Sequence, residues 1–150
     1  MIDIEQDFHG WLLDQAAALR SRHSELLDWD HLAEELEIMG ARERRELRAE
    51  LKVLLLHLLK LEFQPGEVYR HGGWMNSVEE AREHIADILE DSPGIFAGKR
   101  DEVLAEVYGR ARRSAARESG LPASIFPLAC LWSYEQVADP DFFPGLTKIA

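Results

Sequence analysis

The stretch Leu47 to Phe63, LRAELKVLLLHLLKLEF, decides the fold, because leucine recurs along it every three or four residues. This spacing places the repeated leucines on one face of an α-helix. The face consists of Leu47, Leu51, Leu54, Leu58 and Leu61. We expect a helix that begins just after Gly40 and ends at Phe63, where Gln64-Pro65-Gly66 breaks it.

The same segment carries apolar residues on its other sides past Val53, namely Leu55, Leu56, Leu59 and Phe63. A helix that is apolar nearly all round is buried on more than one side. It is therefore either the central helix of a bundle or half of a contact between subunits. We expect full coverage within one chain, and hence a monomer rather than a homodimer.

Helical periodicity continues on both sides of this segment. A first helix is expected from about Asp3 to Arg20 and a second from about Asp28 to Met39, with Gly40 as the left-handed residue that ends it. A fourth opens at Ser77 with a capping-box pattern, and a fifth runs from about Lys99 to Ser119. The inward stripes are predicted to be Phe8, Trp11, Leu12, Gln15 and Leu19 on the first helix, and Trp29, Leu32, Ala33, Leu36 and Met39 on the second.

The remaining segments are predicted to be irregular. A loop from Pro65 to Asn76 carries Trp74, and Leu121 to Trp132 is an extended strap. A short capped helix, Ser133 to Ala138, precedes an aromatic tail from Asp139 to Ala150. The predicted fold is all-α: a single domain over residues 1–150, with about five main helices in one bundle and at least about 60% helix. The aromatic residues of the strap and tail (Phe126, Trp132, Phe142 and Phe143) should pack back on that bundle.

Charge and cysteine usage bear on compartment and partners. The net charge of −11 disfavours nucleic acid as a partner, although Arg110, Arg112, Arg113 and Arg117 form one local basic cluster. The single cysteine, Cys130, cannot form an internal disulfide, which favours a reducing compartment. The sequence shows neither a signal peptide nor an apolar run long enough to span a membrane. We therefore expect a cytoplasmic protein.

Several blocks of sequence, taken in order, resemble the bacterial domain of unknown function 29 family. They include Gln6-Asp7-Phe8, Leu32 to Glu37, Glu43 to Leu47, His57 to Lys60 and Gln136-Val137. The resemblance covers nearly the whole chain and implies a small all-helical fold. It implies no activity, substrate or cofactor.

Catalytic and metal-binding candidates are few. No two of the six histidines are three or four residues apart, so no helical turn offers a pair of metal ligands, and we expect neither metal nor cofactor. One constellation has the residue types of a general base: Glu50, His57 and Lys60 on the third helix, with Glu35 on the flank of the second. The simpler interpretation is that His57 binds a neighbouring carboxylate and Lys60 extends to water.

These observations favour a non-catalytic protein that binds another protein through its surface, the Trp74 loop and the aromatic tail. One alternative is a small enzyme that uses His57 and carboxylates at the edge of the second and third helices. A weaker alternative is nucleic-acid contact through residues 110–117.

Overall fold

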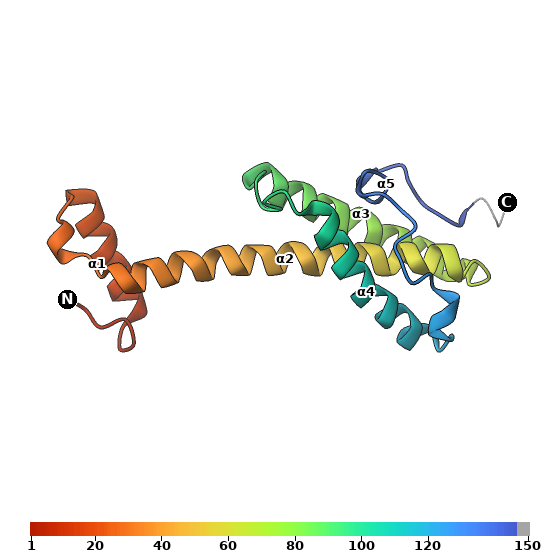
Figure 1. Cartoon of the computed structure of the whole chain (residues 1–150), viewed down its shortest axis with the longest axis horizontal. Coiled ribbons are helices and arrows are strands. Elements are labelled where there is room, and N and C mark those ends of the chain that lie inside the picture. Colours follow the sequence, from red (N-terminus) through yellow and green to blue (C-terminus); the bar gives the residue numbers. More distant parts are fainter. Residues whose placement is uncertain (147–150) are drawn as a thin grey trace. The chain divides into compact units, whose positions relative to one another are not determined.

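The computed structural model describes residues 1–146, and the chain is 72% helical, with no strand among those residues. The all-α prediction is confirmed. Five α-helices and two short 3₁₀ turns follow one another (Figure 1). They are α1 (Phe8–Ser21), η1 (Ser24–Leu26), α2 (Trp29–Phe63), α3 (Val68–Asp91), α4 (Arg100–Ser119), η2 (Ala123–Ile125) and α5 (Tyr134–Ala138). None of the helices within this range is both long and apolar enough to cross a membrane.

Helix α2 corrects the prediction of two helices separated at Gly40. It runs without a break for 35 residues, and Gly40 lies inside it. A glycine in a helix interior costs only about 1 kcal/mol relative to alanine, and strong helix formers flank this one. The predicted stop at Gly120 is confirmed, because that glycine ends α4 with φ of 72°. A glycine ends a helix only where the chain takes the left-handed conformation.

Helix α3 corrects the predicted loop from Pro65 to Asn76. The break after Phe63 is short, and the helix restarts at Val68, so that Ser77 lies within it rather than at its N-cap. Gly72 and Gly73 lie inside this helix. The buried side chains of His71 and Trp74 flank these glycines and hold this turn against the core.

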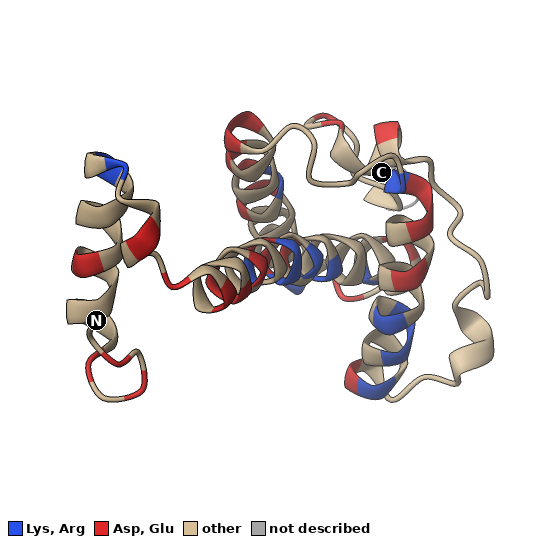
Figure 2. Cartoon of the chain, turned by 60° about the vertical axis from the view of Figure 1, so that its left-hand side comes forward, with Lys and Arg blue, Asp and Glu red and all other residues tan. Residues whose placement is uncertain are grey.

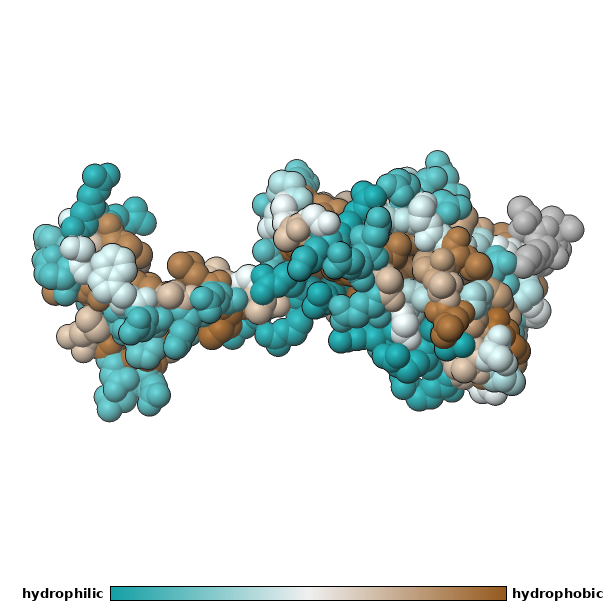
Figure 3. Space-filling model, in the orientation of Figure 1, coloured by the Kyte–Doolittle hydropathy of each residue, from teal (hydrophilic) through white to brown (hydrophobic). Residues whose placement is uncertain are grey.

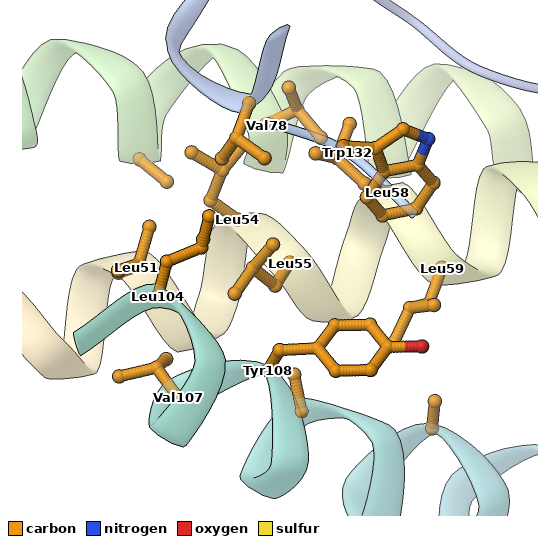
Figure 4. Close-up of a cluster of buried hydrophobic side chains, with 14 of the residues drawn as sticks. Leu51, Leu54, Leu55, Leu58, Leu59, Val78, Leu104, Val107, Tyr108 and Trp132 are labelled. Atoms are coloured by element: carbon orange, nitrogen blue, oxygen red, sulfur yellow. The ribbon is translucent and has the colours of Figure 1, made fainter. Parts of the chain in front are cut away.

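The chain forms two compact units, residues 1–43 and 44–150. The expectation of one domain over residues 1–150 stays a prediction. The core of the second unit is built on the leucine stripe of α2, with α3, α4 and the C-terminal segment packed around it (Figure 4). Leu54 and Leu58 are fully buried, as predicted. Leu55 and Leu59 on the other side are buried as well, and Leu56 and Phe63 pack against the same core.

Two buried or half-buried arginines hold the C-terminal segment onto the helices. Arg82 of α3 donates from Nε to the carbonyl of Val137 (2.9 Å) and from Nη2 to that of Phe142 (2.7 Å). Arg112 of α4 donates from Nε to the carbonyl of Phe126 (2.9 Å). These bonds satisfy carbonyls of an irregular segment that has few backbone partners of its own.

The packing of the aromatic residues is confirmed. Phe126 and Trp132 are buried, and Phe142 and Phe143 lie against the core. The short helix α5 has the predicted capping box between Ser133 and Gln136. Residues 147–150 of the expected tail lie outside the described range.

The first unit has a much smaller interior. Its buried side chains are Trp11, Gln15 and Ala18, all on α1. The predicted inward stripes are therefore largely wrong, because Phe8, Leu12 and Leu19 of α1 and Trp29, Leu36 and Met39 of α2 are exposed. The periodicity identifies these faces correctly as apolar, but nothing in the first unit covers them.

Candidate interaction surface

A hydrogen-bonded cluster joins α1 to the start of α2 inside the first unit. The indole Nε1 of Trp11 donates to Oδ2 of Asp28 (3.0 Å), and Nδ1 of His31 lies 2.8 Å from the same oxygen. Gln15 completes the cluster: its amide accepts from the backbone N–H of Asp28 (2.7 Å) and donates to the carbonyl of Leu26 (3.2 Å). The buried Gln15 thus ties α1 to the connection that precedes α2.

The charges of this cluster reinforce one another. The hydrogen bond from His31 holds the pKa of Asp28 below its usual value, and the same bond raises the pKa of His31. The T-shaped contact between the rings of Trp11 and His31 places the imidazole beside the indole. The cluster therefore favours a protonated His31 against an ionised Asp28.

Local sequence sets where α1 begins. Asp7 accepts from the backbone N–H of Gly10 (2.9 Å) and caps the helix, so α1 starts at Phe8 and not near Asp3 as predicted. Any Cβ at residue 10 would collide with the carboxylate of Asp7, which explains the glycine there. The helix ends at Ser21, and its C-cap residue, Arg22, has a left-handed φ of 60°.

Two rows of exposed apolar side chains run along the helices of this unit. We call them the N-terminal apolar stripes: Phe8, Leu12 and Leu19 on α1, and Trp29, Leu36 and Met39 on α2. Those on α2 are 63%, 67% and 63% exposed. Of the seventeen large apolar side chains that are exposed within residues 1–146, eleven lie in residues 1–43. The space-filling view shows the resulting brown patches on this unit (Figure 3). Clustered apolar surface of this kind is typical of binding sites.

The candidate catalytic residues have other partners. Nδ1 of His57 lies 2.7 Å from the carbonyl of Val53, one turn earlier, and donates to it. Burial lowers the pKa of His57, so its neutral form is favoured. Glu50 binds His84 instead of His57, with Oε2 at 3.2 Å from Nδ1. The carboxylate whose charge acts on His57, raising the pKa of the imidazole, is Glu118, so the predicted group of Glu50 and His57 is not formed.

The other two members of that constellation do not complete it. Nζ of Lys60 lies 3.5 Å from Oε2 of Glu118 and 5.9 Å from the centroid of the Trp74 ring. Glu35 is on the same continuous helix as His57, about six turns earlier, and not on a separate facing helix. Within residues 1–146 no three His, Cys, Asp or Glu side chains gather as a metal site would require.

Comparison with known proteins gives one match: the family model for a domain of unknown function, DUF29, covers residues 4–143. The chain belongs to the DUF29 family. No curated protein and no solved structure matches it. The match spans both units of this DUF29 chain and covers the N-terminal apolar stripes as well as the leucine core.

The basic cluster on α4 of this DUF29 chain is largely engaged in internal contacts. Besides its bond to Phe126, Arg112 donates from Nη2 to the carbonyl of Ala123 (2.9 Å). Arg110 forms an ion pair with Glu106 (3.3 Å), and Arg117 donates to the hydroxyl of Ser114 (3.2 Å). These arginines support the structure of the second unit and do not form a uniform basic strip.

The aromatic residues that were expected to form a binding loop and tail are buried or packed. Trp74 is buried on α3, where it lies against His71. Phe126 and Trp132 belong to the core of the second unit. Within residues 1–146, most of the exposed large apolar side chains of this DUF29 chain are therefore in its first unit, a location that sequence reasoning missed. The available signal was the stripe on residues 29–39, which extends the apolar face of α2 before Leu47, the first leucine of the core.

Proposed function

We propose that this protein is a non-catalytic interaction module of the cytoplasm that binds a partner protein through the N-terminal apolar stripes. The observation that carries the proposal is the concentration of exposed apolar side chains in residues 1–43. Solitary exposed leucines are ordinary in soluble proteins. A dense group of them exposes apolar surface to water at a cost in free energy, and a bound partner removes that cost by covering the surface.

The ordered helices that carry the N-terminal apolar stripes support this proposal. The cluster of Trp11, Asp28 and His31 fixes α1 against the start of α2, so the side chains of the stripes are presented on ordered helices. A preorganised apolar surface loses little conformational entropy on binding. A reducing compartment is supported by the single cysteine of the sequence, Cys130, which has no second cysteine with which to form an internal disulfide.

Site-specific photo-crosslinking in the native organism tests the proposal. A photoreactive phenylalanine analogue replaces Leu36 in one strain and Leu128 in another. Leu128 is the matched control, since it is 83% exposed but lies in the second unit. We expect a discrete crosslinked protein from position 36 and none from position 128. Equal crosslinking from both positions, or none from position 36, contradicts the proposal.

A further inference from the structure

On the basis of the proposed function, we infer that the partner is a second copy of this chain, whose α2 packs antiparallel against the first over residues 29–46. The inference rests on three features: the small interior of the first unit, the charge pattern along residues 28–48 of the chain and the spacing of the apolar residues on α2.

The interior of the first unit is too small to support it alone. A chain shorter than about 40 residues that folds alone usually needs a disulfide, a metal or another chain, and the first unit, residues 1–43, is close to that limit. The only cysteine, Cys130, lies in the second unit, and the described residues contain no metal-binding group. Trp11, Gln15 and Ala18 are its buried side chains. Of the three possible supports (a disulfide, a metal or another chain), this leaves association with another chain.

The charge pattern of α2 indicates that the second chain is a copy of this one, because α2 is complementary to itself in an antiparallel pair. Residues 28–37 contain five carboxylates and no lysine or arginine, a charge of −5. Residues 38–48 contain four arginines and two glutamates, a charge of 4 − 2 = +2. Red is followed by blue along this part of α2 in Figure 2. An antiparallel pair sets the acidic segment of each copy beside the basic segment of the other, whereas a parallel pair sets like charges together.

The apolar spacing agrees with such a pair at its centre. Trp29, Leu32, Leu36 and Met39 follow one another at intervals of three, four and three residues, the spacing of a two-stranded coiled-coil seam. In an antiparallel pair with its twofold axis between residues 37 and 38, Leu36 of each copy meets Met39 of the other. The small Gly40 beside the seam allows the two backbones to approach closely. The seam ends before Leu47, which is buried in the second unit.

Glu35 and Arg42 fix the register. They are one heptad apart and therefore lie on the same flank of the seam. In the antiparallel pair Glu35 of each copy faces Arg42 of the other, which gives two equivalent ion pairs across the twofold axis. The face bearing Leu55, Leu56, Leu59 and Phe63, which would have been the other basis for a dimer, is covered within the second unit and takes no part.

Sedimentation velocity of the full chain at micromolar concentration is the first test. We expect a dimer whose dissociation constant rises on the order of 100-fold in Leu36→Glu, because each copy then places a charge at the seam. Leu128→Glu is the matched control and should leave the dimer intact. Circular dichroism verifies that each variant is folded. A monomeric wild-type chain, or a Leu36→Glu variant that dimerises normally, overturns the inference.

Charge exchange tests the register. Glu35→Arg and Arg42→Glu should each weaken self-association, because one sets arginines against arginines and the other glutamates against glutamates. Mixing the two variants restores both attractive pairs, so a heterodimer should form. If the mixture stays monomeric while the wild-type chain dimerises, the register is wrong.

Disulfide trapping tests the direction of the helices. In a Cys130→Ser background, Glu35→Cys and Arg42→Cys chains should crosslink when mixed and not when oxidised separately. Efficient crosslinking of either variant alone would indicate a parallel pair and contradict the inference. The photo-crosslinking experiment separates the two proposals. A crosslink from position 36 to a different protein would overturn self-association and leave the proposed function standing, whereas no crosslink would contradict both.

Discussion

Leu36 and Leu58 lie on the same helix, on apolar faces with similar spacing, and have opposite surroundings. Leu58, in the second unit, is completely buried among residues of α2, α3, α4 and the C-terminal segment. Leu36, in the first unit, is 67% exposed. Of the 22 buried apolar residues in residues 1–146, 20 belong to the second unit. The comparison shows that an apolar helix face predicts a surface that will be covered. It does not tell whether the cover comes from the same chain or from another.

The largest change in the free energy of unfolding is expected for a substitution in the core of the second unit. Leu58→Ala is expected to lower its free energy of unfolding by about 2–5 kcal/mol, because a buried leucine leaves a cavity when it is truncated. Leu36→Ala is the matched change in the first unit and should alter the unfolding of the second unit by less than about 0.5 kcal/mol. Urea denaturation, with hydrogen exchange assigned to residues 47–61, measures both. Equal losses would remove the distinction between the two units.

Arg82 gives the next largest effect. Arg82→Met removes two charge-assisted hydrogen bonds to the C-terminal segment, each worth about 1.5–3 kcal/mol. Burial of the guanidinium lowers its pKa and offsets part of that gain, so we expect a net loss of about 2–3 kcal/mol. Limited proteolysis should then cut between residues 120 and 143 sooner than in wild type. The exposed Arg113→Met is the control, and similar cleavage of both variants would refute this role.

A smaller effect is expected in the first unit. Trp11→Phe keeps the ring in the interior but loses the hydrogen bond to Asp28, and water can replace that bond at the partly exposed carboxylate. We expect a loss of about 1 kcal/mol. Amide protection in residues 8–21 should fall roughly fivefold. Trp29→Phe, which changes an exposed indole, should leave that protection unaltered. If Trp11→Phe has no effect on these amides, the cluster does not hold α1.

The smallest expected effect is on the pH dependence of stability, which should have opposite directions in the two units. The bond to Asp28 raises the pKa of His31, so its contribution to the first unit is present below about pH 6.5 and is lost as pH rises through the raised pKa. Burial lowers the pKa of His57, so its neutral form stabilises the second unit above about pH 6.5, and this is lost as pH falls through the lowered pKa. His84 should titrate above its usual value, because it binds Glu50.

Titration of the histidine ring signals by NMR checks these directions. His31 and His84 are expected to titrate above about pH 6.5 and His57 below it. Asp28→Asn is the control, because it should return His31 towards its usual pKa and leave His57 unchanged. A His57 that titrates above His31 would reverse the comparison.

Much of the second unit could be predicted from sequence, because periodicity and local stop signals act over short distances. The buried face of Leu54 and Leu58, the end of α4 at Gly120 and the cap at Ser133 all follow from such local patterns. The errors arose where tertiary packing outweighed a local signal. Gly40 did not interrupt α2, and burial of Trp74 extended α3 through its two glycines.

The candidate surface was harder to predict, since periodicity identifies an apolar face and gives no information on its cover. Residues 29–39 therefore looked like another core stripe. The proximity of Asp28 to His31 was visible as an i, i+3 pair, but the contribution of Trp11 depends on a contact 17 residues apart. Glu50 likewise binds a histidine of α3, and no local pattern indicates that pairing.

The anchoring of residues 137–143 by Arg82 has a consequence for synthesis on the ribosome. Leu54 is translated 83 residues before Val137, so the leucine face of α2 must wait for its last covering segment. At about 5–20 residues per second, that delay is roughly 4–17 s. Throughout it, the nascent chain carries an incompletely covered apolar helix, the kind of surface that chaperones recognise. The second unit can reach its native packing only after Phe142 has been released from the exit tunnel.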